Sequence, residues 1–178
     1  MTHRHDIERN VVLGQLAAAR VPVHIEQRCA VPTLGQGGAD GAYHDGVKWI
    51  NIDMTVVNPT NDTNFKKAAV TPLCAALAAE NTKRTKYAAH YASVGEGFAP
   101  FAMEVYGALG PSAAHIIGAG VQRLLDAYGK IDKYCAAQWK AETYARLSCT
   151  LQRTTAQGCR ALTRRILRQG RSAAPLSL

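Results

Sequence analysis

Two acidic residues in the stretch DGAYHDGVKWINIDMTVVN are well placed to do chemistry. Asp40 opens the stretch, and Asp53 follows after 12 intervening residues, inside an apolar run. A lone carboxylate among apolar side chains is costly, because its charge loses contact with water. Two adjacent carboxylates can share Mg²⁺, which prefers one or two carboxylates together with waters and phosphate oxygens. A metal would thus explain Asp53, although Arg28 or Lys48 could also pair with it.

The motif KRTKY, downstream of the acids, supplies candidate cations. Lys83, Lys86 and Tyr87 are spaced i, i+3 and i+4, which places them on one face of a helix. A lysine that faces a phosphate can orient an attacking water or stabilise the developing negative charge. The alternatives are a solvated helix face with Tyr87 as a packing residue, and a turn role for Asp40.

Elements that would position these residues follow from apolar spacing and from glycine and proline signals. The Asp-Gly pair at 45–46 predicts a hairpin turn. We expect helices over residues 5–20, 72–91 and 111–129, strands over 21–31, 40–45, 47–57 and 95–107, and one or two helices over 131–169 with a break at Gly158. This order predicts a single α/β domain.

Composition excludes several classes of protein. The 178 residues are 47% hydrophobic and 19% charged, which is typical of a globular domain with a sizeable core. No apolar run reaches transmembrane length, and the N-terminal residues are too polar for a signal peptide. The five cysteines show no zinc-ligand spacing, which favours reduced thiols in an intracellular protein.

Positive charge is concentrated near the C-terminus. Residues 1–128 contain 11 basic and 11 acidic side chains, whereas residues 129–178 contain 10 basic and 2 acidic ones, so the whole excess of +8 lies there. A polyanionic partner, nucleic acid before membrane, fits this asymmetry. A solvated basic tail, or a face that docks on another domain, is the alternative. Six arginines fall within about 40° of one line on a helix and form a predicted arginine stripe: Arg146, Arg153, Arg160, Arg164, Arg168 and Arg171.

These motifs together resemble a known family. Asp40, the strand IDMTVV, the motif KRTKY and the segment FAPFAMEVYGALG, with RHD near the start, are similar in order and spacing to one nuclease domain. That domain is the restriction-like endonuclease of site-specific non-LTR retrotransposons, in the PD-(D/E)XK superfamily. The similarity covers residues 4–125.

The resemblance implies a restriction-endonuclease-like αβββαβ core with a mixed sheet flanked by helices over residues 1–128. Basic C-terminal helices over 129–178 would pack on it. It further implies a phosphodiester hydrolase that nicks chromosomal DNA, so that the freed 3′ end primes reverse transcription. Asp40 and Asp53 would bind Mg²⁺ or Mn²⁺, and Lys83, Lys86 and Tyr87 would complete the catalytic site. The implied partners are DNA and the reverse transcriptase part of the same element, without a membrane, in the nucleus.

This sequence departs from the family pattern at three positions. Ala39 replaces the proline before Asp40, Gly38 stands where a basic residue would be, and Thr55 stands where the strand lysine of the superfamily would be. Lys83 or Lys86 would then take the place of that lysine. A nuclease fold that has lost catalysis and only binds nucleic acid, or a retrotransposon remnant, is therefore the alternative. A small α/β scaffold protein with a basic docking tail is a third hypothesis.

Overall fold

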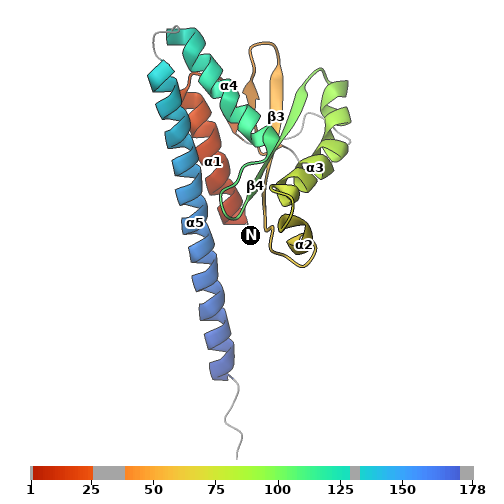
Figure 1. Cartoon of the computed structure of the whole chain (residues 1–178), viewed down its shortest axis with the longest axis vertical. Coiled ribbons are helices and arrows are strands. Elements are labelled where there is room, and N and C mark those ends of the chain that lie inside the picture. The colour runs from red at the N-terminus through yellow and green to blue at the C-terminus, as the bar shows by residue number, and fades with distance from the viewer. Residues whose placement is uncertain (1, 26–38, 129–132, 173–178) are drawn as a thin grey trace, which may run out of the picture.

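A four-stranded sheet with helices on both faces forms the body of the protein (Figure 1). The computed structural model describes residues 2–25, 39–128 and 133–172. Its elements are α1 (Thr2–Ala18), β1 (Val23–Ile25), β2 (Gly41–His44), β3 (Trp49–Val57), α2 (Phe65–Ala68), α3 (Cys74–Ser93), β4 (Gly97–Glu104), α4 (Pro111–Tyr128) and α5 (Lys133–Ser172). The predicted α/β class, with a mixed sheet flanked by helices, is confirmed. None of the described helices has the length and apolarity to cross a bilayer.

The strands lie in the order β1-β2-β3-β4. The first three are antiparallel neighbours, and β4 lies parallel to β3. The predicted hairpin joins β2 to β3: Asp45 Oδ1 accepts hydrogen bonds from the backbone N–H groups of Val47 (2.8 Å) and Lys48 (2.9 Å). Gly46 completes this turn with a φ of 107°, a conformation that favours glycine. The parallel pair needs a crossover connection, and α3 supplies it.

Alternating side chains on β3 give the sheet two different faces. Ile50, Ile52 and Met54 point into the main core, together with apolar residues of α1, β4, α4 and α5. The residues between them, including Asp53, point to the opposite face, which α3 covers. A smaller cluster on that side contains Ala39, Tyr87, Tyr91 and Phe98. The period of two along the strand thus separates an apolar core from a face that carries a buried acid.

The predicted element boundaries differ from the structure in several places. α1 begins at Thr2, so His5 belongs to a helix and not to a frayed end. The strand expected over 21–31 is seen at Val23–Ile25, and its remainder lies outside the described residues. The short helix α2 occupies part of a predicted loop.

Of the two predicted alternatives, one helix is confirmed and a break at Gly158 is wrong, because α5 is a single helix of 40 residues. A break would leave two new helix ends with backbone groups that lack intrahelical partners. A glycine inside a helix costs only about 1 kcal/mol relative to alanine, so continuity is the less costly outcome.

The second half of α5 extends beyond the body of the protein (Figure 1). Leu147 and Leu151 are fully buried, whereas every residue over 156–166 is exposed, including Leu162 (59%) and Ile166 (58%). A 40-residue helix is about 60 Å long, and the 17 residues of α1 extend only about 26 Å. α5 therefore runs out of packing partners among the described elements, and we call residues 156–166 the arm.

Candidate functional site

The two candidate acids lie where the start of β2 pairs with the middle of β3. The backbone N–H of Asp40 donates to the Ile52 carbonyl (2.8 Å), and Gly41 is paired with Ile52 in the sheet. The paired register ends at Gly41, and Asp40 bonds to the same residue that Gly41 faces, so Asp40 lies beside the residue that precedes Asp53. The hairpin thus brings the two residues to neighbouring backbone positions, as their spacing predicted. The sharing of a cation remains a prediction.

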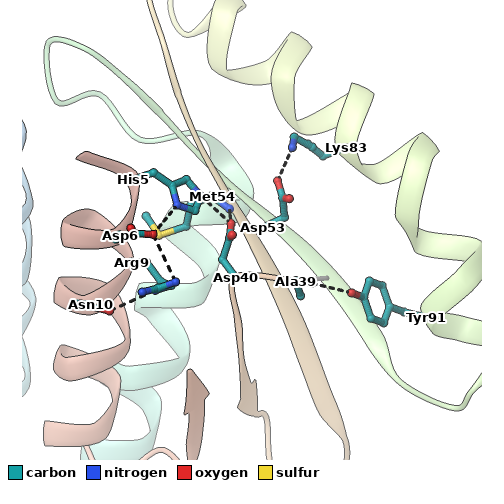
Figure 2. Close-up of polar contacts among 10 residues, drawn as sticks. All are labelled: His5, Asp6, Arg9, Asn10, Ala39, Asp40, Asp53, Met54, Lys83 and Tyr91. Atoms are coloured by element: carbon teal, nitrogen blue, oxygen red, sulfur yellow. Dashed lines mark hydrogen bonds and ion pairs between the residues drawn. The ribbon is translucent and has the colours of Figure 1, made fainter. Parts of the chain in front are cut away.

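Asp40 is held from the side of α1. Its Oδ2 accepts a hydrogen bond from the backbone N–H of Met54 (2.6 Å) and contacts His5 Nε2 at 2.9 Å (Figure 2). The hydrogen bond to Asp40 raises the pKa of His5, against the opposing effect of burial. Asp40 therefore has a backbone donor and a titratable side chain beside one of its oxygens.

Asp53 is paired from the opposite side by α3. The carboxylate is buried (8% exposed), and Lys83 Nζ lies 2.7 Å from Oδ2 (Figure 2). The contact between this ammonium and the buried oxygen is an ion pair. Burial raises the pKa of Asp53, Lys83 opposes that rise, and the negative charge of Asp40 adds to it. Lys83 is the partner that the buried acid requires, whereas Arg28 lies outside the described residues and Lys48 lies at the hairpin turn.

The three candidate residues in the KRTKY motif, Lys83, Lys86 and Tyr87, have different surroundings. Lys83 turns to Asp53, while Lys86 is exposed with Nζ 4.7 Å from the centre of the Tyr87 ring. Contact with the Tyr87 hydroxyl raises the pKa of Lys86. The Tyr87 ring itself is 9% exposed and packs against Phe98, with ring centres 5.4 Å apart. Both lysines thus lie beside the Tyr87 ring, with Lys83 Nζ 5.7 Å from its centre, and Lys83 is the one that pairs with Asp53.

Other buried acids have structural partners. Both carboxylate oxygens of Glu80 accept the backbone N–H of Ser112 at the start of α4 (3.0 and 3.2 Å). Glu104 Oε1 accepts the N–H of Ala76 at the start of α3 (3.4 Å). Negative charge is favourable at a helix N-terminus, so these two glutamates cap helices. Asp53 has a lysine partner instead.

Two hard oxygen donors suit Mg²⁺ or Mn²⁺ better than a soft metal. Within the described ranges, no group of three or more His, Cys, Asp or Glu side chains is arranged to hold a metal ion. A cation here would depend on Asp40, Asp53, waters and a phosphate oxygen. The chain matches no protein-family model and no curated protein.

Four arginines of the predicted stripe lie exposed along α5: Arg146, Arg153, Arg160 and Arg164. Arg168 and Arg171 belong to the same helix, but their side chains lie outside the described part. The uninterrupted helix keeps the stripe on one line. The apolar residues of the other face are packed up to Leu151, whereas Leu162 and Ile166 on the arm are exposed.

An open groove of about 930 Å³ lies elsewhere, between the β2–β3 hairpin and α4. Lys48 and Arg123 line it together with Asp45 and Asp126, so its formal charges balance. Burial in its wall raises the pKa of Tyr43 to about 12. The groove contains neither candidate acid.

His5 is a site residue that the sequence patterns did not predict, because residues so near a chain terminus are commonly poorly ordered. The motif RHD could have indicated it, because it places a histidine directly before an aspartate at the start of a predicted helix. Only the packing of α1 beside β2 and β3 brings this histidine to Asp40.

Proposed function

We propose that the chain is a metal-dependent DNA endonuclease domain of the restriction-like type found in site-specific non-LTR retrotransposons. It would nick target DNA so that a reverse transcriptase can extend the freed 3′ end. The observation that carries this proposal is the 2.7 Å ion pair between Lys83 and the buried Asp53, one residue along β3 from the backbone partner of Asp40. Two acids at neighbouring backbone positions, with a lysine paired to one of them, are the kinds of group that phosphodiester hydrolysis uses.

The order of elements supports the same proposal. A helix, three antiparallel strands, a crossover helix and a fourth strand parallel to the third correspond to an αβββαβ core. In that core, the acids would lie on the second and third strands. α2, α4 and α5 are additions to it.

Each site residue would have a distinct task. Asp40 and Asp53 would hold Mg²⁺ or Mn²⁺, which supplies an activated water and neutralises charge on the phosphate. Lys83 carries a positive charge beside Asp53, where it can stabilise negative charge that develops on the phosphoryl oxygens. Lys86 is exposed next to Tyr87 and could contact a neighbouring phosphate. Tyr87 would act by holding the two lysines apart.

The departures from the family pattern have compensations in this fold. The Ala39 N–H donates to the Tyr91 hydroxyl (3.1 Å), a bond that proline could not make. Tyr91 thus fixes the backbone immediately before Asp40. The lysine missing from β3 is replaced in space by Lys83 from α3. These contacts support a competent site in spite of Ala39 and Thr55.

The arm extends beyond the end of α1 that carries His5. α5 runs antiparallel to α1, because Thr143 contacts Gln15 (3.3 Å) and Thr154 contacts Glu8 (3.2 Å). His5 lies about 4.5 Å nearer the start of α1 than Glu8, so the site is level with residues just beyond Thr154. Arginines on the arm could therefore hold the backbone of the DNA being cut.

Plasmid nicking tests the proposal. Wild-type protein with Mg²⁺ or Mn²⁺ should convert supercoiled plasmid to open circles, and a chelator should stop it. Asp53→Ala should abolish nicking without unfolding the domain, whereas Asp126→Ala, which removes an exposed acid of α4, should leave the rate unchanged. Nicking by Asp53→Ala at the wild-type rate would exclude Asp53 as a metal ligand.

A nucleic-acid-binding module without catalysis is the second candidate. It is favoured by the fact that both acids already have positively charged or N–H partners without a metal. Such a protein would bind duplex DNA through α5 and would nick no plasmid with any divalent cation. Binding without nicking by the folded wild-type protein would decide for this candidate.

A further inference from the structure

His5 lies between two carboxylates. Its Nε2 is 2.9 Å from Asp40 Oδ2, and its Nδ1 is 3.5 Å from Asp6 Oδ1 (Figure 2). Asp6 Oδ1 is in turn 3.5 Å from the guanidinium of Arg9. The ring is therefore oriented from both ends, and its nearer nitrogen points at the candidate metal ligand.

The contact with His5 fixes one particular oxygen of Asp40. Oδ2 also receives the Met54 backbone N–H at 2.6 Å, so two donors from different elements converge on this atom. Among the described residues, Oδ1 of Asp40 accepts no hydrogen bond. Two donors at one oxygen restrict rotation of the carboxylate and leave the other oxygen available to a ligand.

We infer that His5 is a positioning residue that orients Asp40 for metal binding by donating its Nε2 hydrogen to Oδ2. This inference rests on the proposed endonuclease function. It gives α1 a role in the site, beyond the roles proposed for the two acids and the lysines. His5 acts through Asp40 and touches neither metal nor DNA. The role of the α1 N-terminus is thus to present one hydrogen-bond donor to the second strand.

Two substitutions separate the hydrogen bond from other roles of the histidine. Glutamine carries an N–H donor at a position similar to Nε2, whereas alanine carries none. His5→Ala should weaken Mn²⁺ binding and lower kcat for plasmid nicking by about tenfold or more, the usual effect of losing a hydrogen bond to a charged group. KM for DNA should stay the same. His5→Gln should recover most of both losses.

Mn²⁺ affinity is measured by electron paramagnetic resonance without DNA, and kcat and KM are measured with plasmid. Full activity and Mn²⁺ affinity in His5→Ala would overturn the inference. Equal losses in His5→Gln and His5→Ala would overturn it too, because the charge and not the hydrogen bond would then matter. A rise in KM alone would show that His5 contacts DNA directly and would contradict the positioning role.

A double-mutant cycle distinguishes failure of this inference from failure of the proposed function. Thermal unfolding of His5→Ala, Asp40→Asn and the double variant, without metal or DNA, measures the coupling of the two side chains. Absence of coupling overturns the role of His5 whatever the chain cleaves. If the two side chains are coupled but the wild-type protein neither binds Mn²⁺ nor nicks DNA, the proposed endonuclease function is overturned, and the metal-positioning role of His5 with it.

Discussion

Replacing Arg153, Arg160 and Arg164 with glutamine should flatten the salt dependence of DNA binding. All three are exposed on one face of α5. Each arginine that neutralises one duplex phosphate contributes about 0.9 to the slope of log affinity against log salt concentration. Removal of three such contacts should therefore lower the slope by about 2.7. Between about 50 and 200 mM salt, this corresponds to an affinity loss about 40-fold smaller than that of the wild type.

Fluorescence anisotropy with labelled duplexes over a series of KCl concentrations measures the slope. A matched control replaces Lys48, Arg123 and Lys140 with glutamine, which removes the same charge from exposed positions off the stripe. This control should keep a slope close to that of the wild type. Duplexes of unrelated sequence should lose affinity alike in the stripe variant, because phosphate contacts carry no base information.

A wild-type slope in the stripe variant would refute this reasoning. The stripe would then face solvent or a partner domain, and the nucleic-acid proposal would depend on the acid pair alone. An equal loss of slope in both triple variants would also refute it, since the effect would then reflect net charge. Nicking by the stripe variant at saturating DNA should stay near the wild-type rate, because the arginines serve binding.

Two further predictions concern stability. Asp53→Asn should raise the free energy of unfolding at neutral pH, because burial raises the pKa of Asp53 in the folded state above its usual value of 3.8. The folded state then binds the Asp53 proton more tightly than the unfolded state, so the wild type loses stability as pH rises from 3.8 through the folded-state pKa. In urea titrations, the unfolding free energies of the wild type and Asp53→Asn should therefore converge as pH falls toward 3.8. A difference that stays constant with pH would contradict this. Leu151→Ala should cost about 2–5 kcal/mol in the same titrations, because the side chain is fully buried. Leu162→Ala on the exposed arm should change stability by less than about 0.5 kcal/mol, and equal losses would show that the arm is packed.

Local sequence determined most of the elements in this fold. The alternation in β3 and the Asp-Gly turn specify a hairpin, because a strand that is buried on one face tolerates no shift of register. That hairpin alone brings Asp40 beside the β3 residue that precedes Asp53. The spacing of the arginines likewise places them on one line of a helix, because 3.6 residues per turn is a property of the backbone.

Tertiary packing decided the partners of the acids. The sequence predicts Lys83 and Lys86 on one helix face, and in the structure Lys83 pairs with Asp53 whereas Lys86 is exposed. His5 reaches Asp40 across 35 positions in the chain because α1 packs beside the hairpin. Long-range contacts of this kind leave no periodic trace in a sequence.

The two halves of α5 show the same division. Leu151 and Leu162 both follow helical apolar spacing, so the sequence predicts one apolar face for the whole helix. Burial of that face depends on which elements pack beside it, and the described elements bury Leu151 and leave Leu162 exposed. The sequence therefore determined the helix and its charged line, whereas tertiary packing decided that Leu151 is core and Leu162 is surface.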